Sequence, residues 1–413
     1  MRILFFLLFI CFYGGVIAKT IEVCPTCPHK SINSAIISAD KNDVVLVKKG
    51  VYKEFEIIID KPLTLKGEQG AVIDGDNQGE IIIVESPGVT IDGFEIRNVG
   101  TSNLRDFSAV RIKEQTNFLV QNLTIHKPFF AIYLEKSNNG VVRNNKIYGE
   151  AVGEFGFANG IQLWYSHENL IEGNEVHQMR DGIYCEFSDR NIFKNNFVEK
   201  NARYGLHFMF CHDNAVLNST YKSNGAGIAI MFSKRTNAHN NTFADNWGGS
   251  SYGILLKECY DSEFSHNLFK RNTVGINIEG SSRMKYYNND FQSNGWAIRS
   301  RGANYENIFE KNNFLDNSFD LSYYGQINRN SFDGNYWSDY SGYDLDRDGI
   351  GDIPYRPIKL FSYLVNKAPQ AIILLRSLFI DIIDFSEKVS PVFVPDNLVD
   401  EKPVMKMIKH DRN

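Results

Sequence analysis

A glycine or alanine followed by an aliphatic residue recurs at a nearly constant interval along most of the chain. Gly160, Gly182, Gly205, Gly227, Gly253 and Gly275 are each followed by Ile or Leu, at spacings of 22, 23, 22, 26 and 22 residues. Ala131 and Ala297 extend this series, and Ala109 begins it. A fixed period of this length indicates a solenoid, in which each repeat packs only against its neighbours.

A second series of asparagines keeps the same period. Its members each have an apolar residue two positions later: Asn145, Asn174, Asn195, Asn241, Asn267, Asn289, Asn312 and Asn330. Asn favours turns, so each repeat alternates short strands with corners. The leucine framework of leucine-rich repeats is missing. We predict an all-β fold, a right-handed parallel β-helix with coils of about 22 residues over residues 19–335, in which stacked Asn side chains bond along the axis.

Both ends of an open coil need caps, because its strand edges are otherwise unpaired. At the N-terminal end, Ser31–Ala39 has the pattern of a short amphipathic helix with Ser31 as its N-cap. Strands at Val44–Val47, Phe55–Ile59 and Leu63–Leu65 then lead into the first coils.

The C-terminal region, residues 336–413, contains an acidic loop and an amphipathic tail. In Ala371–Val389 the polar residues Ser377, Asp381, Asp384 and Lys388 follow helical spacing, while Ile373, Leu374, Ile380 and Ile383 lie opposite. This helix either caps the solenoid or docks a partner.

The first 18 residues have the features of a secretory signal peptide. Arg2 precedes an apolar run from Ile3 to Ile17, and Ala18 offers a cleavage position. No later run is long enough for a transmembrane span, so we expect an exported protein without a span of its own. A net charge of −5 gives no reason to expect nucleic-acid binding.

Two methionines and a histidine fall on outward positions of adjacent coils. If the Ile or Leu after each Gly points inward, His207, Met209 and Met231 point outward, and the two Met stack at the spacing of neighbouring strands. His212 follows near the next corner. Exposed thioether and imidazole groups suit Cu(I). The alternative is that the Met pair only fills an apolar surface stripe.

Five cysteines remain after export, so at least one is unpaired within the chain. Cys24 and Cys27 form a CxxC motif beside the mature N-terminus, which is either a small disulfide or a second copper-capturing group.

The segment from Asp344 to Asp352 resembles the start of a calcium-binding loop. Asp344, Asp346 and Asp348 occupy alternate positions, Gly349 follows, and Asp352 is the next acid. Position 12 is Tyr355 rather than Glu, so the loop is not a complete EF-hand. It is either a calcium site or an empty acidic turn.

Many exported β-helices act on polysaccharides, so a lyase, hydrolase or epimerase is the alternative function. Glycoside hydrolysis needs two facing carboxylates. Of the polygalacturonase-like motifs only Arg111-Ile-Lys113 occurs, far from the expected place, and the outer positions of the coils are mostly neutral or aromatic. This pattern disfavours catalysis.

Two blocks of sequence resemble a known family. Asn201-Ala-Arg-Tyr-Gly-Leu-His207-Phe-Met209-Phe-Cys-His212-Asp-Asn is similar to the central motif of NosD, the periplasmic maturation protein of nitrous oxide reductase. Gly334-Asn-Tyr-Trp-Ser-Asp-Tyr, the acidic loop, Ile353-Pro-Tyr-Arg-Pro357, Ala368-Pro-Gln-Ala and Leu374-Leu-Arg-Ser377 resemble its C-terminal block. Cys24, Cys27 and Cys211 are not part of that resemblance.

The resemblance implies a binding and transfer role rather than catalysis. NosD-like proteins are periplasmic β-helices on an ABC-type transporter, which consists of a permease and an ATPase. They are thought to accept copper from a lipoprotein chaperone and to help load nitrous oxide reductase. For this chain the resemblance favours copper at His207, Met209 and Met231, with His212 as a candidate fourth ligand.

Overall fold

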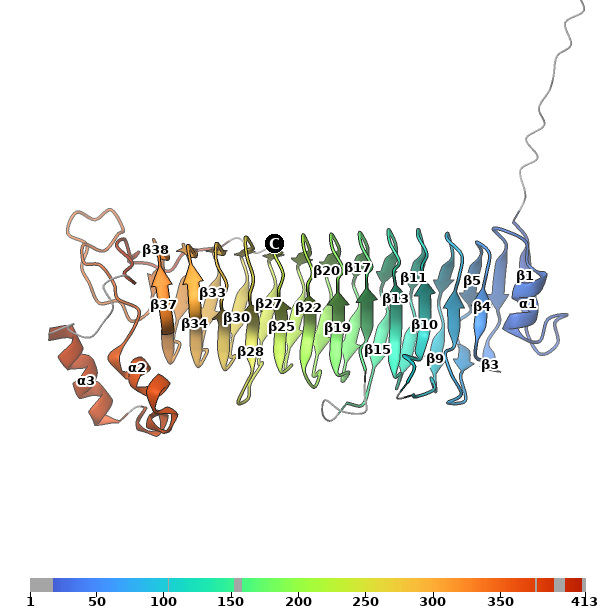
Figure 1. The fold of residues 1–413 in the computed structure, drawn as a ribbon, viewed down its shortest axis with the longest axis horizontal. Helices are drawn as coiled ribbons and strands as arrows, with labels where there is room; N and C mark the ends of the chain where they lie inside the picture. Colours follow the sequence, from blue (N-terminus) through green and yellow to red (C-terminus); the bar gives the residue numbers. More distant parts are fainter. Residues whose placement is uncertain (1–17, 103, 152–157, 376, 390–397, 411–413) are drawn as a thin grey trace, which may run out of the picture.

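The computed structural model describes residues 18–102, 104–151, 158–375, 377–389 and 398–410. The chain winds into a long parallel β-helix of three sheets, with helices at its two ends (Figure 1). The predicted all-β solenoid is therefore confirmed. The predicted signal peptide lies almost entirely outside the described residues.

Each complete coil contributes one strand to each sheet, and the pairings between strands are parallel. Sheet A contains β1 (Thr20–Val23), β2 (Val44–Val47), β5 (Thr64–Gly67), β8 (Thr90–Asp92), β11 (Leu119–Gln121), β14 (Val141–Arg143), β17 (Leu170–Glu172), β20 (Ile192–Lys194), β23 (Ala215–Leu217), β26 (Asn237–His239), β29 (Glu263–Ser265), β32 (Lys285–Tyr287), β35 (Ile308–Glu310) and β38 (Ser331–Asp333). Sheet B contains β3 (Gly50–Lys53), β6 (Ala71–Asp74), β9 (Glu95–Arg97), β12 (Thr124–His126), β15 (Lys146–Tyr148), β18 (Glu175–His177), β21 (Phe197–Glu199), β24 (Thr220–Lys222), β27 (Thr242–Ala244), β30 (Leu268–Lys270), β33 (Asp290–Gln292), β36 (Asn313–Leu315) and β39 (Tyr336–Trp337). Sheet C contains β4 (Ile57–Ile59), β7 (Ile82–Val84), β10 (Ser108–Lys113), β13 (Phe130–Glu135), β16 (Ile161–Trp164), β19 (Asp181–Glu186), β22 (Tyr204–Met209), β25 (Ala226–Met231), β28 (Tyr252–Lys257), β31 (Val274–Glu279), β34 (Trp296–Tyr305) and β37 (Phe319–Asn328).

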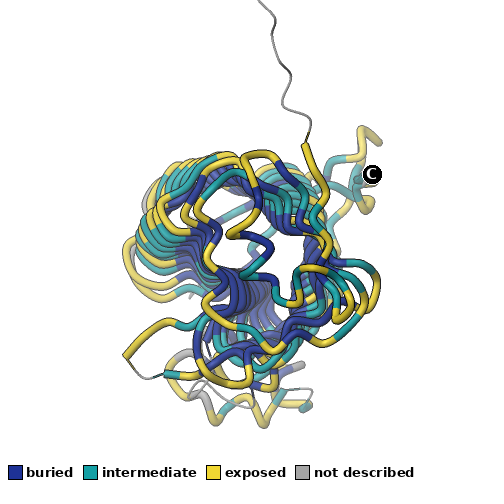
Figure 2. Tube along the Cα trace, turned by 90° about the vertical axis from the view of Figure 1, so that its right-hand side faces the viewer, coloured by how far each residue is buried: buried dark blue, intermediate teal, exposed yellow. Residues whose placement is uncertain are grey.

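The core lies inside the coil because alternate residues of every short strand point inward. The end-on view shows buried positions on the inner wall and exposed ones outside (Figure 2). Equivalent inward residues stack from coil to coil, as in the ring series Phe243, Phe269, Phe291 and Phe314, with centroids 4.8–5.0 Å apart. This stacking buries apolar surface continuously along the axis.

Buried asparagines stack at the corner between sheets A and B, as predicted. In a typical step, Asn267 Nδ2 donates to Asn289 Oδ1 at 3.0 Å, and the backbone N–H of Asn267 donates to the same oxygen. Two predicted members were wrong. Asn195 has a positive φ and its neighbour Asn196 occupies the ladder, while Asn330 accepts a bond from Asn307 at a different corner.

The N-terminal cap matches the prediction closely. Helix α1 spans Ile32–Ser38, and the Ser31 hydroxyl accepts a hydrogen bond from Ser34 N–H. Glu54, from the first coils, accepts from the N–H groups of Ile32 and Asn33. These contacts satisfy orphan donors at the start of the helix.

The C-terminal tail differs from the prediction of one helix over Ala371–Val389. Helix α2 (Leu360–Lys367) precedes it, a 3₁₀ helix η1 follows at Pro369–Leu374, and α3 begins only at Leu378 and ends at Val389. The break falls at Leu375, whose ψ of 129° is outside the helical range. Among the described residues, no helix is long and apolar enough to cross a membrane.

Candidate functional site

The outer face of sheet C carries the predicted methionine pair. Met209 ends β22 and Met231 ends β25, and the two residues are direct register partners. Both side chains are half-buried. The stacking predicted from the repeat is therefore confirmed, and two thioethers lie side by side at the spacing of adjacent strands.

His207 lies on the same face of β22, two residues before Met209, but it is not exposed as predicted. Only 3% of the residue is accessible. Tyr184, its register partner on β19, and Tyr204, on its own strand, place their rings 4.8 Å from the imidazole in edge contacts. An outward position on a strand thus became buried because neighbouring aromatic side chains cover it.

The two ring nitrogens of His207 have different surroundings. Nδ1 lies 3.3 Å from Oδ2 of Asp181, a fully buried residue at the start of β19. Nε2 is buried and has no hydrogen-bond partner. A buried nitrogen without a partner is costly unless something binds to it. Among the predicted ligands, this is the atom that most clearly fits a metal.

His212 is separated from the methionine pair by the corner at Phe210. It forms an isolated bridge with Lys234, and its backbone N–H donates to Asp189 at 2.7 Å. Its Nδ1 is also buried without a partner. The described contacts do not bring His212 together with His207.

An aromatic strip runs along the corner beside the methionines. We define it as Tyr165, Phe187, Phe210 and Phe232, whose rings stack with centroids 4.9, 5.2 and 5.0 Å apart. All four residues have positive φ, a conformation that is unfavourable for bulky side chains. The equivalent corners of other coils carry Glu114, Lys136, Glu258, Gly280 and Gly302. The coil geometry therefore does not require aromatic residues here.

The three cysteines that are unpaired among the described residues point into the core. Cys185, Cys211 and Cys259 are fully buried, and burial raises the pKa of Cys211 to about 12 and that of Cys259 to about 11. Cys211 Sγ donates to the carbonyl of Cys185, as Ser166 Oγ does to that of Leu134 in an earlier coil. Cys211 thus replaces a serine in the corner ladder and does not face the methionines.

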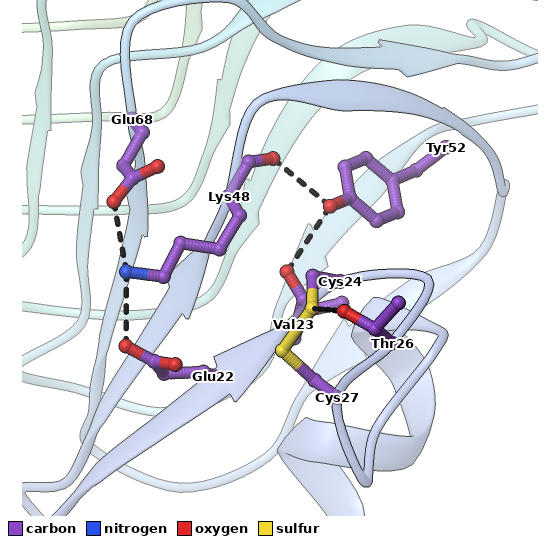
Figure 3. The surroundings of a disulfide bond; sticks show 8 residues. All are labelled: Glu22, Val23, Cys24, Thr26, Cys27, Lys48, Tyr52 and Glu68. Atoms are coloured by element: carbon purple, nitrogen blue, oxygen red, sulfur yellow. Dashed lines mark hydrogen bonds and ion pairs between the residues drawn. A yellow bond between two sulfur atoms is a disulfide. The ribbon is translucent and has the colours of Figure 1, made fainter.

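Cys24 and Cys27 are joined by a disulfide in the structure, beside β1 and α1 (Figure 3). The sulfur of Cys24 also lies 3.3 Å from the Thr26 hydroxyl. Of the two alternatives for this motif, the structure contains the disulfide, and in that form neither sulfur is a thiolate ligand.

The acidic loop gathers three of its four predicted ligands. Carboxylate oxygens of Asp344, Asp346 and Asp348 lie within 4.8 Å of one another. Asp352 is not in this group, because its Oδ2 accepts from the N–H of Leu345 at 2.8 Å. The N–H of Asp348 lowers the pKa of Asp346, but repulsion by neighbouring carboxylates leaves that pKa raised overall. A cation would relieve this repulsion.

A hollow of about 520 Å³ on sheet C is lined by Arg111, Tyr133 and several carboxylates. Arg111 lies within it and bonds to Glu80 at 2.5 Å and Glu135 at 2.9 Å, while its guanidinium covers the ring of Tyr133. Both carboxylates are thus paired with the same cation. Three further acids, Glu56, Asp106 and Glu186, also line the hollow, so the contacts of Arg111 alone do not decide whether it could support hydrolysis.

Comparison with known proteins identifies the family. A family model described as "Periplasmic copper-binding protein (NosD)" matches residues 150–342, the coils that hold the methionine pair. A "Probable ABC transporter binding protein NosD" from Pseudomonas aeruginosa is 30% identical over 366 residues, 85% of each chain. The chain belongs to the NosD family. A NosD relative from Stutzerimonas stutzeri is 27% identical and covers 92% of this chain and 90% of its own.

Solved structures show that the NosD-family chain shares its fold with polysaccharide enzymes. A mannuronan C-5 epimerase module from Azotobacter vinelandii has a TM-score of 0.59 at 11% identity, covering 76% of this chain and 96% of its own. The catalytic unit of an α-1,3-glucanase from Streptomyces thermodiastaticus has a TM-score of 0.60 at 13% identity, covering 72% and 65%. At these identities the likeness concerns the fold alone.

Sequence reasoning missed Asp181 in this NosD-family site. Asp181 lies 26 positions before His207, outside the block that carries the family resemblance. The repeat did contain a signal, because Asp181 directly precedes the glycine of its coil and shares its register with Tyr204. A search for acids at that register position would have found it.

Proposed function

We propose that the protein is a periplasmic copper acceptor that works while docked on an ABC-type transporter in the maturation of nitrous oxide reductase. One observation supports this proposal most strongly. Met209 and Met231 stack in register beside His207, whose buried Nε2 has no partner. The family is described as copper-binding, and two relatives carry names that refer to an ABC transporter.

Copper is the cargo in this proposal, and Cu(I) is the form that thioethers prefer. Met209 and Met231 are neutral ligands and bind without losing a proton. Nε2 of His207 is covered, so a neighbouring side chain must move before copper reaches it. We therefore place the methionines as the first contact and His207 as a later ligand. His212 remains a candidate fourth ligand, supplied from beyond the corner.

The aromatic strip supports delivery of copper by a protein. Two of its residues, Phe210 and Phe232, directly follow the two methionines in the sequence. Tyr165 and Phe210 are 43% and 38% exposed, which is unusual for large rings held in an unfavourable backbone conformation. We assign this surface to a copper-chaperone lipoprotein, and nitrous oxide reductase is the recipient.

The test is titration of the purified mature protein with Cu(I) against a chromophoric chelator. The double change Met209→Leu and Met231→Leu keeps the volume of both side chains and removes both sulfurs. We expect wild-type protein to bind Cu(I) and the double variant to lose most of its affinity. Met284→Leu is the matched control, because Met284 is fully buried in the core.

If the wild type and the double variant bind Cu(I) with equal affinity, the two methionines only pack on the surface and do not bind copper. A complementary measurement in cells is the copper content of nitrous oxide reductase, which should fall in the double variant and stay normal in the control. The polysaccharide-enzyme alternative gains no support from the described contacts of Arg111.

A further inference from the structure

The contact between Asp181 and His207 is unusual for the outer face of this solenoid. Asp181 is 0% exposed, and the side chain of His207 is 4% exposed. Oδ2 of Asp181 and Nδ1 of His207 are 3.3 Å apart, and the two residues come from neighbouring strands, β19 and β22. A buried carboxylate is costly unless it is paired, so a role for this contact is expected.

The second oxygen of Asp181 fixes the orientation of the carboxylate. Oδ1 accepts a hydrogen bond from the backbone N–H of Tyr204 at 3.3 Å. The rings of Tyr184 and Tyr204 contact the imidazole at interplanar angles of 66° and 72°. The imidazole is therefore held by one carboxylate and two rings.

This arrangement decides which nitrogen of His207 carries the proton. An ionised carboxylate only accepts hydrogen bonds, so Nδ1 must be the donor. In the neutral imidazole the lone pair then lies on Nε2, the nitrogen without a partner. Metal-binding histidines commonly use such a carboxylate to fix their tautomer and ring orientation.

We propose that Asp181 is the positioning residue of the copper site, holding His207 with its proton on Nδ1 and its Nε2 lone pair available to Cu(I). This inference rests on the proposed function and adds a residue that does not itself touch copper. It also specifies Nε2 as the ligand atom of His207.

Asp181→Asn tests the inference with almost no change in shape. The N–H of Tyr204 continues to need an acceptor, so the amide oxygen takes the place of Oδ1 and the amide nitrogen faces His207. An amide nitrogen donates and cannot accept, so the proton of His207 moves to Nε2. An Asp-to-Asn change beside a catalytic histidine has this effect in a serine protease.

Two measurements follow. Nitrogen-15 NMR of the histidine rings in metal-free protein should show the Nδ1–H form in wild type and the Nε2–H form in Asp181→Asn. The affinity for Cu(I), measured by chelator competition, should fall about 10–100-fold in the variant, the usual effect of losing such a partner. Asp320→Asn is the matched control, a buried Asp further along sheet C.

The double variant Asp181→Asn, His207→Ala separates positioning from stability. If Asp181 acts through His207, Asp181→Asn has no further effect on affinity once the imidazole is gone. Equal effects in both backgrounds would overturn the inference, as would a wild-type His207 with its proton on Nε2. The wild-type NMR spectrum decides this even if the variant does not fold.

The outcomes also distinguish the inference from the proposed function. Wild-type binding of Cu(I) with unchanged affinity in Asp181→Asn overturns only the role of Asp181. Failure of the wild type to bind Cu(I) overturns the proposed function and the inference together.

Discussion

A single carboxylate, Asp400, terminates the asparagine ladder of the solenoid. It is 0% exposed and comes from the segment that follows the tail helices. Oδ2 accepts from the backbone N–H and side-chain amide of Asn335 and from Trp337 Nε1, each at 3.0 Å, and Oδ1 accepts from Gly334 N–H. Without Asp400 these donors would lack a hydrogen-bond acceptor, because no further coil follows the last one.

We expect Asp400→Ala to loosen the final coils selectively. Each buried donor left without a partner costs about 1–3 kcal/mol, so the three donors of Asn335 and Trp337 should together cost the terminal coils about 3–9 kcal/mol of stability. Hydrogen exchange should accelerate in β35, β36, β38 and β39 but not near β10, because repeats are stabilised by their neighbours. Asp333→Ala, at an exposed position of β38, is the control. Uniform exchange along the solenoid would contradict a local cap.

Residue-scale features of the site could be predicted only in part. The repeat gave the register, so the stacking of Met209 on Met231 was predictable. It did not predict that His207 is buried, because its imidazole is covered by one ring from the adjacent coil, Tyr184, and one from its own strand, Tyr204. The pairing of Asp181 with His207 also joins two coils, and no local motif marks it.

At the scale of elements, the acidic loop is joined to the segment that carries Asp400. Gly351 N–H donates to the carbonyl of Pro403 at 2.8 Å, and Met405 N–H donates to that of Gly349 at 3.0 Å. Backbone N–H groups of residues 348–350 bond to the clustered carboxylates. We propose that calcium binds Asp344, Asp346 and Asp348, with Asp352 orienting the loop backbone.

Calcium at millimolar concentration should therefore slow hydrogen exchange over residues 344–352 and 403–405 and raise the apparent melting temperature. Binding to the folded state alone stabilises it by about 2.7 kcal/mol at a concentration 100 times Kd. Asp346→Asn with Asp348→Asn should abolish the effect, whereas Asp316→Asn, an exposed Asp outside the loop, should retain it. Identical exchange in calcium and in chelator would show that the loop is only an acidic turn.

Predicted elements at the N-terminal end agreed with the structure because local sequence signals marked them. The strand Val44–Val47 and the cap helix were placed within one residue, because a short run of β-branched apolar residues and a capping serine are local signals. The tail was placed less well. The apolar spacing of the sequence continues through η1 and α3, so it did not reveal the break at Leu375. The prediction also did not include α2.

At the scale of the whole molecule, the tail has one side against the solenoid and another that is uncovered. Ile380 is 7% exposed and packs with Val274, Trp296 and Phe361. Ile383 is partly buried against the same cluster. The side chains of Asp381, Asp384 and Lys388 lie outside the described residues. The helix therefore caps the solenoid through Ile380 and Ile383, and these two residues are unsuitable for testing a docking role.

The helices α2 and α3 lie at the end of the solenoid (Figure 1), and large apolar residues of η1 and α3 are exposed there. Ile373 is 85% exposed, Leu378 74%, Ile382 55% and Phe379 53%. Exposed apolar side chains of this size favour a contact surface. Within the proposed function, its occupant is the permease of the ABC-type transporter, so the two roles of the tail fall on different residues.

The double change Ile373→Asp and Leu378→Asp should release the protein from its transporter without unfolding it. Burial of each side chain in a contact contributes about 1.5–3 kcal/mol, so binding should weaken by at least about 100-fold. Co-purification with the permease and ATPase subunits measures this, and circular dichroism checks the fold. Ile37→Asp is the matched control, because Ile37 is 79% exposed at the opposite end of the solenoid.

Ile380→Asp should instead disturb the tail itself, since it places a charge in the buried cluster. Retained co-purification of the double variant would show that the tail is a cap and that the transporter contacts another surface.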